Sequence, residues 1–276
     1  MGAYADLNEY VNRKTGGNSG LPDYFMVSKE WRIAGAVATA PAIGRWHSSW
    51  LLEGTPSHGN VPTTAAACDN TTSGGFMQTA PGGGRQKWLD SVVACCSNNS
   101  SVMIYDRLLH CGGLSGLLTI AQTVGGAITR YTGGVGNAIF VEINTAIGTT
   151  ATTATVSYTN QAGTAGRTSP AFPIGGTNLR EQGRAIPVPL QSGDSGVRSV
   201  ESITLAGSTL TAGDFGVIIA RPLMMLGLQS GAVGTTRTSL DGPIPDVSTA
   251  CLAFMFHSNA TTVPTTLSLF AAMAER

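Results

Sequence analysis

The sequence predicts a mainly β protein, built as a β-sandwich or jelly-roll-like domain with an N-terminal arm or elaboration. Three observations lead to this prediction. Over residues 101–276, apolar and polar side chains alternate in short runs, turn signals rich in Gly and Asn separate these runs, and few stretches show helical spacing. Short strands at such spacing are typical of β-sandwiches and jelly rolls. We therefore expect one domain over residues 61–276, preceded by residues 1–60 as the arm.

Residues 1–60 differ in character from the rest of the chain. They hold three of the four tryptophans, and their first apolar residues fall at helical spacing, which favours a short helix. Because interfaces gather aromatic anchors, we expect this segment to contact other subunits. The alternative is that it supplies the first strands of the sandwich. The candidate inter-subunit contacts are Tyr4, Leu7, Tyr10, Trp31, Trp46 and Trp50.

Residues 60–100 are rich in loop signals, such as the glycine run at Gly82–Gly84. The stretch Arg85–Cys96 fits two elements. Its residues Trp88, Val92 and Cys96 have helical spacing, whereas an adjacent β-branched pair favours a strand. The sequence alone leaves both open.

The remaining residues are predicted to form strands throughout. Ile139, Val141 and Ile143 alternate with residues that face the other way, and the same period recurs around Val156. The stretches Val217–Ala220 and Cys251–Phe256 are apolar on both faces. Strands of that kind are buried between layers. These two stretches are therefore predicted to be the central strands of the sandwich.

Charged residues are scarce. Only 12% of the 276 residues are Asp, Glu, Lys or Arg, against about 25% in an ordinary soluble domain. The chain has 16 Lys and Arg and 16 Asp and Glu, so its net charge is zero. Soluble proteins usually keep a charged surface that holds copies apart. The composition therefore predicts a protein whose surface lies largely against other subunits.

The same composition argues against several classes of partner and site. The basic residues form no cluster of the kind that binds phosphates, so neither a nucleic acid nor a membrane surface is expected as a partner. The apolar stretches are too short and too interrupted to span a bilayer. Five cysteines without a secretory signal predict unpaired thiols. The Cys and His spacings match no metal motif, and the glycine runs match no phosphate-binding loop. No metal or cofactor is therefore expected.

One short motif resembles part of a catalytic site. Gly193-Asp194-Ser195-Gly196 copies the signature around a serine-protease nucleophile, but no histidine stands in the sequence context that such an enzyme requires. Gly, Asp and Ser are also the residue types that favour a tight turn. We expect a turn, no catalytic residue and no enzyme activity. The tryptophans leave open a sugar-stacking face, although core or interface packing is the more common use of such residues.

Several stretches resemble virion structural proteins of tailed bacteriophages, of the kind encoded near the major capsid gene. They are Tyr105–His110, Gly112–Gly116, Thr129–Gly136, Ala154–Gly163 and Gly166–Thr168. The resemblance covers roughly residues 100–270 and carries over no catalytic site. It implies a capsid-associated protein with jelly-roll character.

Composition and resemblance together predict a cement or decoration protein on the capsid exterior, synthesised in the cytoplasm of a bacterial host. Its expected partners are copies of itself and the major capsid protein. Two alternatives stay open: the major capsid subunit, and a host-facing adhesin or lectin-like module. The first usually has a long spine helix and an extended hairpin, which the sequence does not indicate, and the second needs an exposed aromatic or polar cleft.

The arm hypothesis predicts the result of a truncation. Deleting residues 1–22 should leave a folded β protein that binds capsids poorly, because an arm that crosses to a neighbour gains little contact within its own subunit. Circular dichroism would report the fold, and co-sedimentation with capsids would report binding. Decoration by the truncated protein equal to that of the full chain would contradict the hypothesis.

Overall fold

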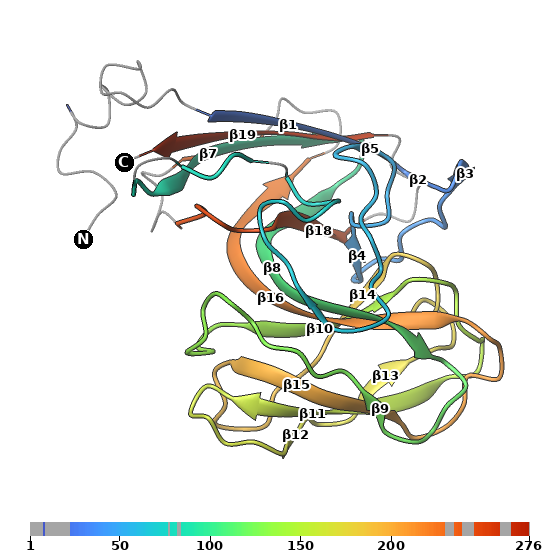
Figure 1. Cartoon of the computed structure of the whole chain (residues 1–276). Coiled ribbons are helices and arrows are strands. Elements are labelled where there is room, and N and C mark those ends of the chain that lie inside the picture. The colour runs from blue at the N-terminus through green and yellow to red at the C-terminus, as the bar shows by residue number, and fades with distance from the viewer. Residues whose placement is uncertain are drawn as a thin grey trace.

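The computed structural model describes residue 8 and residues 23–76, 78–81, 84–229, 235–238, 246–259 and 266–275. From Asp23 onward, every helix or strand assigned in these residues is a strand, so the predicted mainly β chain is confirmed. The strands form three layers, with a sheet at the top, a barrel in the middle and a second sheet at the bottom (Figure 1).

The upper layer, called the outer sheet here, is antiparallel and has five strands. Two strands far apart in the sequence lie at its centre, because β1 pairs with β19 along their whole common length. In spatial order the strands are β17 (Thr235–Thr238), β7 (Lys87–Cys96), β19 (Thr266–Glu275), β1 (Asp23–Glu30) and β5 (Gly54–Thr55).

The middle layer is a closed barrel of six strands. The ring closes because β8 pairs with β18 along one edge and with β16 along the other. The short strand β6 (Ala66–Ala67) also pairs with β8. Around the ring the strands are β16 (Asp214–Leu228), β10 (Ala138–Ile143), β14 (Arg184–Pro187), β4 (Trp46–Ser48), β18 (Leu252–Ser258) and β8 (Ser100–Ser115).

The lower layer is a second antiparallel sheet. Its alternating strand β11 carries buried side chains at every second position from Ala154 to Asn160 and intermediate ones between them, as the period-2 pattern predicts. Its strands are, in spatial order, β12 (Arg167–Thr168), β11 (Thr152–Asn160), β15 (Val197–Leu205) and β9 (Gln122–Thr123), and β13 (Phe172–Ile174) also pairs with β11. Outside the three layers, β2 (Arg32–Ile33) and β3 (Ala36–Val37) form a separate hairpin.

Three apolar cores hold the layers together. One lies between the outer sheet and the barrel and contains Val27, Leu89 and Phe254. Another fills the barrel, and the third packs the barrel against the lower sheet. The stretches Val217–Ala220 and Cys251–Phe256 are buried along their whole length, in β16 and β18, so the prediction that they are central is confirmed.

Two alternatives that the sequence left open are settled by the pairing of strands. Arg85–Cys96 contains a strand, β7, and no helix. Residues 23–60 supply β1, β4 and β5 to the outer sheet and the barrel, so this part of the predicted arm is built into the domain. Its apolar residues pair with strands that come late in the sequence, which no local pattern reveals. The predicted helix at residues 4–11 lies outside the described residues, apart from residue 8.

The barrel encloses a buried ion pair between β8 and β10. Arg107 Nη2 donates to Glu142 Oε2 at 2.6 Å, and both side chains are fully buried. The guanidinium also lies over the ring of Trp50, 4.0 Å from its centroid, and donates to the Tyr105 hydroxyl at 3.2 Å. Burial by itself would lower the pKa of Arg107, but the adjacent Glu142 carboxylate raises it above its ordinary value. The pair therefore joins β8 to β10 inside the barrel.

A second buried carboxylate stands next to the first pair in the sequence. Asp106 receives two hydrogen bonds from Arg130, at 2.6 and 2.8 Å, and a third from the backbone N–H of Cys251 at 2.9 Å. The Arg130 side chain reaches Asp106 from the loop beyond β9. The pair thus fixes that loop and the start of β18 against β8.

Removing Glu142 should destabilise the fold strongly. In Glu142→Ala, Arg107 would stay buried without its counter-ion, which typically costs about 3–5 kcal/mol in free energy of unfolding. The matched control is Glu53→Ala, which breaks the partly exposed Arg32–Glu53 pair and should cost no more than about 1 kcal/mol. Urea unfolding of both variants would measure the difference. Equal losses would contradict the structural role of the buried pair.

Candidate assembly surface

The tryptophans predicted as inter-subunit contacts lie mainly inside the subunit. Trp31 is buried against His47 and Phe256, and Trp50 is buried under Arg107. Neither can present its ring to a neighbour, because each ring is needed in the core of its own chain. Only Trp46 remains partly accessible. The other candidates, Tyr4, Leu7 and Tyr10, lie outside the described residues.

The strand β1 separates an inward face from an outward one. Val27 and Lys29 are buried below the sheet, whereas Met26 and Ser28 point away from the core. The Lys29 ammonium donates to the backbone oxygens of Leu52, at 2.9 Å, and Pro56. Burial lowers the pKa of this lysine to about 8. The strand therefore directs a cation into the protein and an apolar side chain outward.

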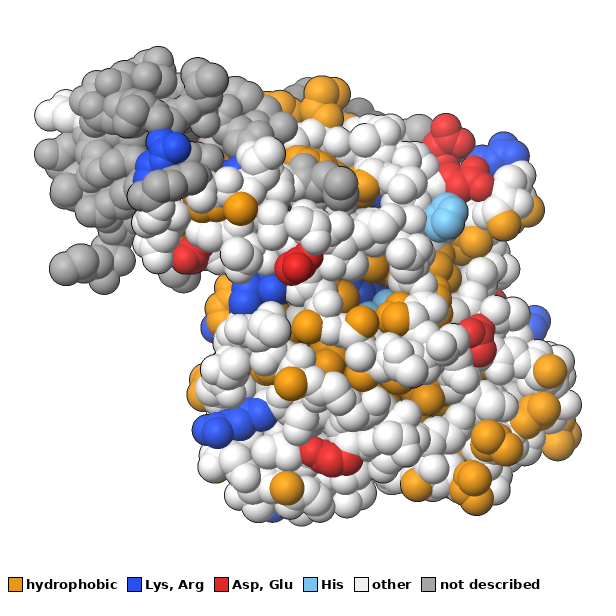
Figure 2. Space-filling view, viewed as in Figure 1, with side chains coloured by type: hydrophobic (Ala, Val, Ile, Leu, Met, Phe, Trp, Pro, Cys, Tyr) orange, Lys and Arg blue, Asp and Glu red, His pale blue; other side chains and the backbone are white. Residues whose placement is uncertain are grey.

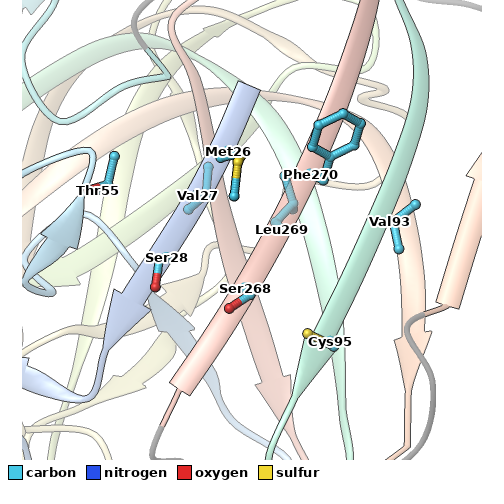
Figure 3. A pocket seen from close by; sticks show the side chains of 9 residues that line it. All are labelled: Met26, Val27, Ser28, Thr55, Val93, Cys95, Ser268, Leu269 and Phe270. Carbon is cyan, nitrogen blue, oxygen red and sulfur yellow. The ribbon is translucent and has the colours of Figure 1, made fainter. Parts of the chain in front are cut away.

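Strand register brings outward side chains of three strands into a row. Met26 of β1 lies opposite Phe270 of β19, and Phe270 lies opposite Val93 of β7. A second row runs through Ser28, Ser268 and Cys95, parallel to the first (Figure 3). Met26 is 74% exposed, the highest fraction among the large apolar side chains described.

The two rows line a shallow groove of about 470 Å³ on the outer sheet. The groove is lined by Met26, Val27, Ser28, Thr55, Val93, Cys95, Ser268, Leu269 and Phe270, none of which is charged. Figure 2 shows that charged side chains are few and scattered over this view of the molecule as well. Most of these side chains are apolar and none carries a charge that would be costly to remove from water, so this face is suited to contact with another protein surface.

None of the groove residues is among the inter-subunit contacts predicted from the sequence. Met26 lies in a run where apolar residues stand at every position from Tyr24 to Val27, so the outward one cannot be told from its neighbours. Phe270 lies in a run where Leu267 and Leu269 alternate with other residues, and that alternation places position 270 on the outward face. What the sequence could not give was the register that puts these residues side by side.

The Gly-Asp-Ser-Gly motif forms a turn held by its aspartate. The Asp194 carboxylate accepts hydrogen bonds from Arg167 at 3.0 and 3.2 Å, Tyr158 at 2.6 Å and Asn160 at 2.7 Å. These bonds, with that of Arg167 first, lower its pKa to about 2. The backbone N–H of Ser195 donates to Gln161. The motif therefore anchors the turn to the lower sheet.

Within the described part of the chain, no group of three or more His, Cys, Asp and Glu side chains could hold a metal ion. The described residues include no helix with the length and apolar character needed to cross a membrane.

Comparison with known proteins gives weak similarities. No family model matches the chain, and no curated protein matches it. Among solved structures, the chain aligns with T=1 particles derived from infectious bursal virus at 8% identity, over 92% of this chain and 78% of that one, with a TM-score of 0.19. The VP2 subviral particle of infectious bursal disease virus gives 8% identity, 92% and 80% coverage, and a TM-score of 0.17. TM-scores this low carry no argument about what the chain does.

The bonds to Asp194 predict how stability depends on pH. The folded pKa of about 2 lies below the ordinary value of 3.8, so the folded state binds fewer protons than the unfolded state. The stabilisation is present above about pH 4 and is lost as the pH falls toward 2. The free energy of unfolding of Asp194→Asn should therefore be lower than that of the wild type at pH 7, with the gap shrinking at pH 2.5.

Urea unfolding at both pH values would test this, with Ser195→Ala as the control. The Ser195 hydroxyl is not needed for the turn, so the free energy of unfolding of Ser195→Ala should equal that of the wild type at both pH values. A gap between Asp194→Asn and wild type that is the same at both pH values would contradict the prediction.

Proposed function

We propose that this chain is a virion structural protein, most specifically a capsid cement or decoration protein that forms homo-oligomers. The outer face of its upper sheet contacts a second copy of the chain. It acts by burying surface between subunits, without bond chemistry, cofactor or nucleic acid. Its place is the exterior of a bacteriophage head, against the major capsid protein, after synthesis in the host cytoplasm.

The observation that carries the proposal is the uncharged outer face in a chain that has few charges to begin with. Eight of the described Lys, Arg, Asp and Glu residues are buried, so the surface has even fewer charges than the composition indicates. They include Arg107, Glu142 and Asp106, which take part in the two ion pairs that β8 makes inside the fold. A protein that worked as an isolated monomer would need those charges on its surface for solubility.

A second copy is the occupant that the charge pattern favours. The net charge of the chain is zero, so two copies do not repel each other as a whole. A basic or acidic partner would find no complementary charge on the nine groove residues. A neutral face on a neutral chain is suited to contact between like subunits.

The adhesin alternative is favoured by one specific feature. A cleft of about 380 Å³ lies beside the hairpin of β2 and β3 and has polar residues in its lining. Donors and acceptors of this kind can bind sugar hydroxyl groups. The polar lining residues are His58, Asn60, Asn144, Thr145, Gln182 and Asp214.

The copy number in the virion separates these functions. Quantitative mass spectrometry of purified particles should find hundreds of copies for a cement protein, on the order of the number of capsid subunits, and at most a few tens for an adhesin. Particles that lack the protein should also rupture at a lower temperature than complete ones. Low copy number together with unchanged heat resistance would overturn the cement role in favour of the adhesin.

A charge placed on the outer face should weaken the contact between copies. Met26→Glu would bury a carboxylate where the second copy covers a methionine, and we expect the dissociation constant to rise by about tenfold or more. Sedimentation velocity would measure it. The matched control is Ile120→Glu, since Ile120 is 69% exposed and lies just before β9 of the lower sheet. Equal effects of the two substitutions would contradict a role for this particular face.

A further inference from the structure

Two short segments meet end to end along one edge of β8. The strand β6 pairs with β8 through Ala67 and Leu109, and the backbone N–H of Cys68 then donates to Leu108 O at 3.1 Å. At the next residue of β8, the backbone N–H of Arg107 donates to Cys251 O at 2.8 Å. From there β18 continues along the same edge. Cys68 and Cys251 therefore occupy successive positions on β8, although they are far apart in the sequence.

The side chains of these two cysteines belong to the same apolar core, the one that fills the barrel. The residues are 2% and 0% exposed, and each thiol is the largest cause of the shift in the other's pKa. All five cysteines are free thiols in the structure. Of the other three, Cys95 and Cys96 lie on β7, and Cys111 lies further along β8.

The surroundings favour one of the two sulfurs as the nucleophile. The hydrogen bond from the Cys251 thiol lowers the pKa of Cys68 against the opposing effect of burial, and the nearby Arg107 and Arg130 act in the same direction. The same hydrogen bond and burial raise the pKa of Cys251. Because the thiolate is the reactive form, Cys68 reacts first and Cys251 follows.

We propose that Cys68 and Cys251 are a disulfide site, closed by a small peroxide once the protein leaves a reducing cytoplasm. The Cys68 thiolate attacks one oxygen of hydrogen peroxide, which forms an S–O bond, breaks the O–O bond and releases hydroxide, protonated to water. The Cys251 sulfur then attacks the Cys68 sulfenic acid, forming the S–S bond and releasing a second water. Two thiols lose two electrons and two protons, and one peroxide becomes two water molecules.

Packing at the junction selects a small oxidant. A Cβ added to Gly75 would lie 2.9 Å from Cys251 Sγ, so the loop between β6 and β7 packs directly against the sulfur at Gly75. A disulfide of glutathione size could not enter without opening this loop. The resulting bond would tie the segment that carries β6 to the start of β18, and so lock one edge of the barrel. The inference does not depend on the proposed virion role.

The test uses the full chain with Cys95→Ser and Cys96→Ser, which removes the two thiols that are not buried. The folded protein is treated with hydrogen peroxide, denatured, alkylated and digested. Mass spectrometry should then find the Cys68 and Cys251 peptides joined, and released again by dithiothreitol. Titratable thiols in denaturant should fall from three to one, and the midpoint of thermal unfolding should rise by about 4 °C or more.

A matched variant with Cys68→Ser in the same background should keep its two thiols, give no linked peptide and show no rise in the midpoint. The proposal is overturned if the parent protein yields Cys68 and Cys251 separately alkylated after peroxide treatment. It is also overturned if Cys68 is recovered only as sulfinic acid, or if the linked peptides contain Cys111. The mapping on the parent protein decides the question even if the Cys68→Ser variant does not fold.

Discussion

The antiparallel pairing of β8 with β16 is the constraint on which the rest of the fold depends. It closes the barrel, and it also links the two cores outside the barrel, because both strands run from the upper layer to the lower one (Figure 1). Val102 and Leu226 lie in the upper core, whereas Leu109 and Val217 lie in the lower core. Three irregularities in the register let the pair curve between them, since bulges bend strands and increase their twist. Without this pairing the barrel would be open, and the upper and lower sheets would no longer pack against one continuous layer.

The few charges of this chain are used in an unusual place. The stretch Tyr105–His110 contributes its charges to the interior of the barrel and its junctions. His110 lies in the same interior, where burial and then the charge of Arg107 hold its pKa well below the ordinary value. The charged residues of this stretch therefore stabilise the architecture of the subunit. Because these charged side chains lie in the interior, fewer charges remain on the surface of the subunit.

The parts of the fold that follow from local pattern could be predicted, and those that follow from long-range pairing could not. Alternation around Val156 and the doubly apolar run at Val217–Ala220 identified strands correctly, because burial on one face or two leaves a periodic trace in the sequence. Closure of the barrel leaves no such trace. The tryptophans show the same limit for the candidate surface. Trp31 and Trp50 are buried within the subunit, yet an aromatic side chain is used in cores and at interfaces alike, so its type alone cannot say which.

The pairing of β1 with β19 has a consequence for the order of events in the cell. The outer sheet contains both an early and a very late segment of the described chain, so its central ladder cannot form until translation has reached Glu275. Contacts of such long sequence separation are slow to form, because loop closure must precede them. The row through Met26 and Phe270 therefore comes into being after the barrel strands have been synthesised. A nascent chain that has not yet reached β19 therefore lacks the groove that Met26 and Phe270 line.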